Sequence, residues 1–177
     1  TVTSNATAAP DGTLTADKIT DDSTSGAHYM RDFNIVVSGE KYFFSVFAKK
    51  AEMNHIQLWT AFGSGGLLPK VFSTFDLENG TVEQADADAD STTIEAVGNG
   101  WFRCTIGITA TGSGAEDMGF SLWKDDGSVP SEGSGLESYQ DDGTKGVFIW
   151  GAQFSQHTTL PVGNPYIKTE GSAVYAA

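Results

Sequence analysis

Residues 146–154 form the longest nearly uncharged run of β-branched and aromatic residues in the chain, Gly-Val-Phe-Ile-Trp-Gly-Ala-Gln-Phe. Lys145 precedes the run, and Gln153 is its only polar member. A run of this length and composition, bounded by glycines, indicates a strand that is buried on both faces. We therefore predict a strand in the middle of a sheet, with the other strands arranged around it.

Most other apolar runs alternate with polar residues, which is typical of strands with one solvent-exposed face. Alternation or composition predicts strands at 14–19, 28–35, 41–50, 55–62, 71–77, 93–97, 101–109 and 120–123. Asn79-Gly80 predicts a two-residue hairpin before a further strand at Thr81-Val82. Residues 1–13 are small and polar, and Pro10-Asp11-Gly12 predicts a turn there. Short strands separated by regular turn signals, with no helical stripe, favour an all-β sandwich or jelly roll of two antiparallel sheets.

The length of 177 residues suits one domain, which we predict to cover residues 1–177. The chain has 21 glycines and 11% aromatic residues, a mixture that favours short strands joined by tight turns. No apolar stretch approaches the ~20 residues needed to cross a bilayer. A basic start followed by an apolar run is also missing, so we expect that any secretion signal is absent or removed.

The formal net charge is −13, from 10 Lys and Arg against 23 Asp and Glu. This field repels phosphates and anionic lipids at long range, so neither nucleic acid nor a membrane is an expected partner. The acidity suits an extracellular protein in salty water, where ions screen self-repulsion. Cys104 is the only cysteine, which excludes an intrachain disulfide, and its place in the alternation predicts a core position.

Five stretches together carry a resemblance to a known group of domains. They are Ala9–Lys18, Tyr42–Lys49, Gly98–Cys104, Gly151-Ala152-Gln153 and Asn164–Thr169. In this order, and over nearly the whole chain, the sequence resembles the jelly-roll, lectin-like domains of phage tail fibres and other virion structural proteins. Related domains are appended to secreted polysaccharide-degrading enzymes as carbohydrate-binding modules. Relatives usually carry an acidic residue two positions after the glutamine of Gly-Ala-Gln, whereas this chain has Ser155.

Trp59 and Trp123 are the candidate sugar-binding residues, because strand parity places each opposite the apolar set expected to face the core. A half-exposed indole offers a flat platform to the C–H face of a sugar ring. Lys49 and Gln57 share the outward parity of Trp59 on strands expected to be neighbours, and His55 lies two residues from Gln57. The alternative is that both indoles are buried by the second sheet or a loop. Arg31 is a further candidate contact, with a structural ion pair as its alternative.

A structural calcium ion is an expectation that follows from the resemblance, since such modules commonly hold one between the first and last strands. Asp11, Asp17 and Gln153 are the candidate ligands, because a hard cation prefers oxygen donors. A Pro-Asp-Gly turn alone would also explain Asp11. The alternating run Asp86, Asp88, Asp90 lacks the glycine and glutamate of a helix-loop-helix calcium loop, which favours a solvated loop instead.

Catalysis has little support in the sequence. The three histidines, His28, His55 and His157, have no recognisable partners for nucleophilic or zinc chemistry. We therefore predict a non-catalytic module that binds a polysaccharide and targets a larger secreted enzyme or a phage adhesin. An anionic marine glycan is compatible, because Lys49, Lys70, Arg31 and Lys124 offset the net charge locally. The alternatives are a virion assembly domain without a sugar ligand and, less favoured, a jelly-roll polysaccharide lyase.

Overall fold

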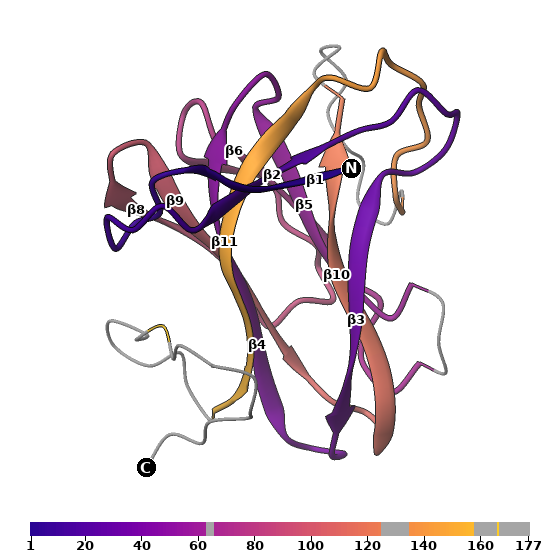
Figure 1. Ribbon diagram of the computed structural model, residues 1–177. Coiled ribbons are helices and arrows are strands. Elements are labelled where there is room, and N and C mark those ends of the chain that lie inside the picture. The colour runs from indigo at the N-terminus through magenta and orange to yellow at the C-terminus, as the bar shows by residue number, and fades with distance from the viewer. Residues whose placement is uncertain (63–65, 125–134, 158–165, 167–177) are drawn as a thin grey trace.

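The computed structural model describes residues 1–62, 66–124, 135–157 and residue 166. It is a sandwich of two antiparallel sheets (Figure 1). The six-stranded sheet has the order β1 (Val2–Thr7), β2 (Ala16–Thr20), β11 (Gly146–Gln156), β4 (Lys41–Lys50), β9 (Trp101–Thr109), β8 (Ser91–Gly98). The five-stranded sheet has the order β3 (Tyr29–Val36), β10 (Gly114–Trp123), β5 (His55–Thr60), β6 (Phe72–Asp76), β7 (Thr81–Gln84). The predicted all-β sandwich is therefore confirmed, and the described residues include no helix able to cross a membrane.

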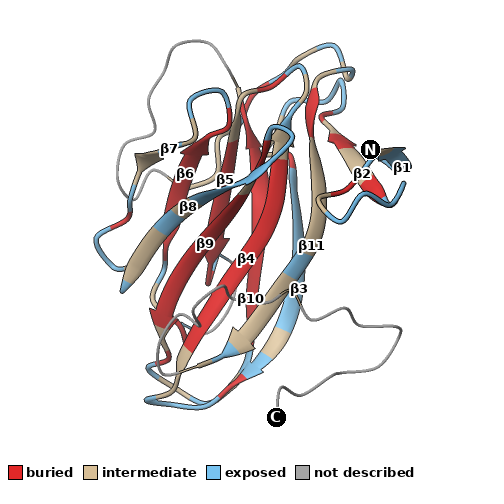
Figure 2. Ribbon diagram, turned by 90° about the vertical axis from the view of Figure 1, so that its left-hand side faces the viewer, coloured by how far each residue is buried: buried red, intermediate tan, exposed pale blue. Residues whose placement is uncertain are grey.

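The main core fills the space between the sheets. On β4, Tyr42, Phe44, Val46 and Ala48 alternate into it, as their spacing predicts. The opposing sheet contributes buried residues from β5, β6 and β10, among them Ile56, Leu58, Phe75, Phe120 and Leu122. Figure 2 shows β4 and β9 almost wholly buried, whereas β3 and β8 are largely exposed. Cys104 is fully buried in this core, as predicted, and burial raises the pKa of its thiol.

Strand β11 lies inside the six-stranded sheet, but the prediction that it is buried on both faces is wrong. Only Gly146 and Val147 are buried. β2 pairs with β11 only as far as Ile149, so the rest of β11 pairs with β4 alone. The register also shifts between Trp150 and Gln153, and Gly151 there has a φ of 59°, which favours glycine. Within the six-stranded sheet, the strands buried on both faces are instead β4 and β9.

Three local predictions differ from the structure. Residues 2–7, expected as part of a polar turn region, form the edge strand β1, which pairs with β2. The pairing uses backbone hydrogen bonds, which the small polar side chains of this segment do not predict. The Asn79-Gly80 hairpin exists, but its loop has four residues, 77–80, and Gly80 takes the positive φ of 67°. Asp86, expected to be solvated, is buried and accepts a hydrogen bond from the Phe72 amide at 2.9 Å.

A second, smaller apolar cluster lies on the opposite side of the six-stranded sheet from the main core. It contains Trp101 and Phe47, and Trp150 packs on its border. The Trp101 indole donates to the carbonyl of Ala8 at 3.1 Å, and that of Trp150 donates to the Thr15 hydroxyl at 3.1 Å. Both tryptophans therefore tie the N-terminal segment to the sheet.

Candidate functional site

The five-stranded sheet has one face on the core and one face turned away from it, which we call the outer face. Strand register sets three rows of side chains across this face. The rows are Trp123–His55–Asp76, then Tyr29–Ser121–Gln57–Thr74, then Arg31–Gly119–Trp59–Phe72. Five of the six ligand-binding residues predicted from the sequence lie in these rows, namely Trp59, Trp123, Gln57, His55 and Arg31. Lys49 is the exception.

Trp59 and Trp123 are on the outer face, as parity predicts, but the expected half-exposed platforms are wrong. Trp59 is 0% exposed and Trp123 is 6% exposed. The ring of Trp59 extends over Gly119, where an added Cβ would come within 2.6 Å of it. Tyr29 and Phe62 then meet its ring, each with centroids 5.8 Å away. Aromatic neighbours on the same face thus remove the indole from solvent.

Gln57 is also buried rather than presented to solvent. Its amide nitrogen donates to the Thr74 hydroxyl at 3.4 Å, and its amide oxygen accepts from the Ser121 hydroxyl at 3.1 Å. These bonds satisfy the side chain across three strands, β6, β5 and β10. Gln57 therefore holds the sheet together in this structure, and His55, half-buried at the next outward position, is the more accessible of the two.

Lys49 does not belong to this face. It lies on β4, and β4 and β5 are in different sheets although they follow one another in the chain. Its side chain instead reaches Gly100, with Cε 3.5 Å from the site of an added Cβ. The prediction assumed that consecutive strands are neighbours, and here the chain crosses from one sheet to the other.

Arg31 forms an ion pair, the structural alternative considered for it, while its role as a ligand contact stays a prediction. Its guanidinium lies 3.7 Å from the carboxylate of Asp117, which is fully buried, and 5.3 Å from the centre of the Phe33 ring. The Arg31 side chain itself is 44% exposed. A buried carboxylate thus orients an arginine whose outer part remains open to solvent.

Among the described residues, the exposed aromatic side chains lie on the side of Trp59. Tyr29 is 41% exposed, Phe33 53% and Phe62 38%. Arg31 lies over Phe33, and the Lys70 ammonium lies 5.9 Å from the centre of the Phe62 ring. We call these five residues the aromatic patch. The alternation of Tyr29, Arg31 and Phe33 was visible in the sequence, but whether that face was the inner or the outer one was not.

Polar atoms without partners also gather on this side of the sheet. The indole Nε1 atoms of Trp59 and Trp123, and the Oε1 of Gln84 on β7, are buried and have no hydrogen-bond partner. An orphaned buried donor or acceptor of this kind costs on the order of 1–3 kcal/mol. Within the described parts of the chain, the outer sheet therefore carries two buried donors and a buried acceptor whose hydrogen-bonding capacity is not used.

A pocket of about 360 Å³ lies on the other side of β3, between the two sheets. Its polar lining includes Arg31, Asp32 and Asn34 from β3, and Gln153 from β11. Its apolar lining includes side chains from both sheets, such as Met118 and Phe154. The pocket and the aromatic patch thus share Arg31 and border the same edge strand.

The three candidate calcium ligands come from three segments, the loop before β2, β2 itself and β11. The Asp11 carboxylate accepts hydrogen bonds from the Thr13 amide and hydroxyl at 2.9 and 2.6 Å. These local bonds fit the turn that was the alternative explanation for Asp11. The Asp17 carboxylate accepts a hydrogen bond from the Asn5 amide at 3.0 Å, and Gln153 lies on β11 beyond the bulge in that strand. A calcium ion held by these residues stays a prediction.

The chain was compared with protein-family models and with curated proteins, and neither comparison finds a match.

Proposed function

We propose that this chain is a non-catalytic polysaccharide-binding module whose glycan lies across the aromatic patch. The observation that carries the proposal is the exposure of Tyr29, Phe33 and Phe62 together on one sheet face, with a cation beside the rings. Exposed aromatic rings on a firm surface are suited to the C–H faces of sugar rings, because they bury apolar area without losing much conformational entropy.

The patch has a rigid support. Trp59 contacts both Tyr29 and Phe62 edge to face, and those two rings lie 6.1 Å apart at 61°. Because Trp59 is fully buried, it can fix the orientation of the two exposed rings without touching the ligand. In this proposal Trp59 is a positioning residue, and the exposed rings take over the binding role that the sequence suggested for the tryptophans.

The charges favour an acidic glycan. Arg31 and Lys70 place two cations at the patch of a chain whose net charge is −13. A guanidinium can bind a carboxylate or sulfate through two parallel hydrogen bonds, and Lys70 adds a point charge. We therefore favour a uronate or sulfated polysaccharide, in surroundings where salt screens the remaining negative charge. The pocket on the far side of β3 has room for a side group that passes the edge at Arg31.

A single shallow site of this kind binds weakly, and linkage to other modules raises its effective concentration. The proposal therefore places the chain within a larger extracellular protein, either a secreted polysaccharide-degrading enzyme or a phage adhesin. Its task would be to retain that protein on the glycan.

The test is a glycan array with the isolated chain, followed by affinity electrophoresis in the best acidic glycan. Tyr29→Ala and Phe62→Ala should each weaken binding about tenfold or more, since burying such a ring contributes about 1.5–3 kcal/mol. Leu14→Ala is the matched control, because Leu14 is 64% exposed but lies outside the outer face. If both ring variants migrate like the wild type in a glycan that retards it, the patch is not the site.

A second candidate function has its own observation in support. β3 is an edge strand, and Ile35 and Val37 at its end are 71% and 50% exposed. An exposed apolar edge strand favours burial against another protein chain. This supports a virion assembly domain without a sugar ligand. Sedimentation separates the two: a monomer that binds glycan favours the module, and a stable oligomer that binds none favours assembly.

A further inference from the structure

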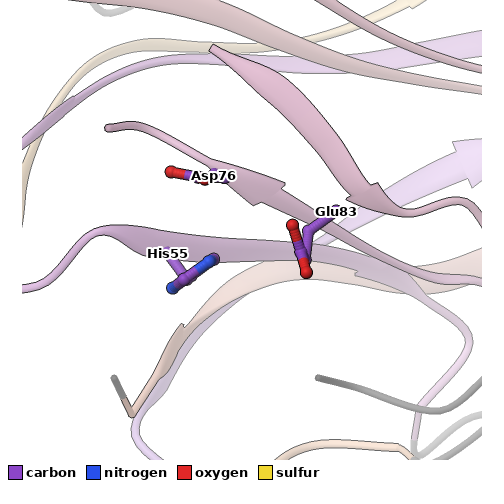
Figure 3. Close-up of side chains that lie close together, drawn as sticks. All are labelled: His55, Asp76 and Glu83. Carbon is purple, nitrogen blue, oxygen red and sulfur yellow. The ribbon is translucent and has the colours of Figure 1, made fainter. Parts of the chain in front are cut away.

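At the other end of the outer face, three neighbouring strands bring together one imidazole and two carboxylates. His55 lies on β5, Asp76 on β6 and Glu83 on β7 (Figure 3). One ligand atom from each lies within 4.8 Å of the others. Among the described residues this is the only group of three His, Cys, Asp or Glu side chains gathered so closely. Sequence spacing could not reveal it, because each ligand comes from a different strand.

Register brings the first two residues together. His55 and Asp76 are directly opposite each other in the β5–β6 ladder, where side chains on one face are neighbours. Thr81 on β7 is opposite Asp76, and Glu83 lies two positions further along that strand, where alternation returns its side chain to the same face. The register shift between Thr74 and Phe75 makes Glu83 the extra residue of β7, between Val82 and Gln84.

Asp76 is already fixed in position. It is 7% exposed, and its Oδ1 accepts from the amides of Glu78 and Asn79 at 2.7 and 3.1 Å. Its Oδ2 accepts from the Asn79 side chain at 2.6 Å. A carboxylate offers about four acceptor positions, so these three bonds orient it and leave one position available. Such outer partners are what holds a ligating carboxylate in place at metal sites.

The other two side chains can complete the set. His55 and Glu83 are both half-buried, and imidazole has two ring nitrogens, so one can bind an ion while the other keeps a hydrogen bond. Ligands held by one ion at about 2.0–2.2 Å are at most about 4.4 Å apart. The present spacing of up to 4.8 Å therefore needs only a small rotation, which the long side chain of Glu83 can supply.

We propose that His55, Asp76 and Glu83 bind one divalent transition-metal ion of the zinc class. One nitrogen and two oxygen donors suit Zn²⁺ or Co²⁺ better than Ca²⁺, which prefers six to eight oxygens. The ion would join β7, an edge strand of four residues, to β5 and β6. It lies in the row of Trp123, away from the aromatic patch, so this proposal does not depend on glycan binding.

The experiment titrates the metal-free chain with Co²⁺, whose visible absorption reports the donor set, and with Zn²⁺ in competition with a chelating dye. We expect one ion per chain, a rise in the melting temperature, and weaker binding as the pH falls, because imidazole must be neutral to ligate. His55→Gln and Glu83→Gln should each weaken binding by more than about tenfold, since even losing an outer partner costs about 10–100-fold.

His157→Gln is the matched control, since His157 lies just beyond the end of β11, in the other sheet, and should leave the titration unchanged. Glu83→Gln is nearly isosteric at a half-buried position, so it gives an answer even if His55→Gln does not fold. The proposal is overturned if the wild type shows no saturable binding. It is equally overturned if the His55 and Glu83 variants bind as tightly as the His157 control.

Discussion

The indole of Trp59 meets the phenol ring of Tyr29 edge to face, with the centroids 5.8 Å apart and the planes at 81°. One ring is fully buried and the other is 41% exposed, although both are on the outer face of the same sheet. The pair therefore divides two tasks between two residues: the buried ring sets the position, and the exposed ring is available to a ligand. Different substitutions should separate those tasks.

Trp59→Ala should lower the free energy of unfolding by about 3–5 kcal/mol, because a large aromatic side chain is removed from a fully enclosed site. Tyr29→Ala should cost far less, since its ring is partly in solvent. Urea denaturation of both variants measures the difference. Equal losses from the two substitutions would show that Trp59 is not enclosed as described.

Gly119→Ala should destabilise the protein by about 1–3 kcal/mol or more. An added Cβ would be 2.0 Å from the Met30 carbonyl oxygen and 2.6 Å from the Trp59 ring, so β3 or the indole must move. Gly26→Ala is the control, because no atom lies within 4 Å of its added Cβ. Thermal melts of the two variants should differ clearly, and matching melting temperatures would contradict the close contact.

Asp21→Asn should make the protein more stable at pH 7. Burial raises the pKa of the Asp21 carboxyl above its ordinary value of 3.8, and its Oδ2 is buried with no partner. Between pH 3.8 and the raised folded value, the folded state binds more protons than the unfolded state, so stability falls as the pH rises through that window. The variant has no carboxyl to ionise, so it avoids this loss of stability. Its higher stability relative to the wild type should vanish below about pH 4, where the wild-type carboxyl is protonated in both states.

Asp142→Asn is the comparison for that experiment. The Thr144 hydroxyl, 2.6 Å away, donates to the Asp142 carboxylate and lowers its pKa. Its ionised form is thus favoured in the folded state, and its contribution to stability is present at neutral pH and lost as the pH falls. Denaturation curves from pH 3 to 7 should show a gain at neutral pH for the Asp21 variant only.

Cys104 should not react with thiol reagents at pH 8 while the protein is folded. Complete burial raises the pKa of its thiol, so little reactive thiolate forms. Burial also keeps the reagent away from the sulfur atom. Addition of denaturant should release one reactive thiol per chain. Rapid labelling of the folded protein would mean that the β4–β9 region opens readily.

The strands could be predicted from the sequence because alternation is a local property, and β4 and β9 have the predicted boundaries of 41–50 and 101–109. Which strands are neighbours is not local. Lys49 and Gln57 are eight positions apart in the chain yet lie in different sheets, and this alone removes Lys49 from the outer face. Parity placed Trp59 on the correct face, but its exposure depends on Tyr29 and Phe62, which approach from other segments.

The candidate metal group shows the same division. His55 was noticed for its outward parity, whereas its association with Asp76 and Glu83 depends on the register of β5 with β6 and of β6 with β7. Neither can be read from spacing along the chain. Gln153, conversely, was predicted from a resemblance and lines a pocket that only the approach of β3 and β11 creates.

The pairing of β2 with β11 also has a kinetic consequence. Ile19 is opposite Val147, so a strand near the start of the chain completes its ladder with one near the end. Closing the long loop between such distant segments costs conformational entropy before the contacts between them form, and this slows folding. During synthesis, the backbone groups on the edge of β2 that pairs with β11 stay unpaired until β11 has left the ribosome. We therefore expect the six-stranded sheet to be the last part of the sandwich to form, and the nascent chain to be vulnerable to aggregation until it does.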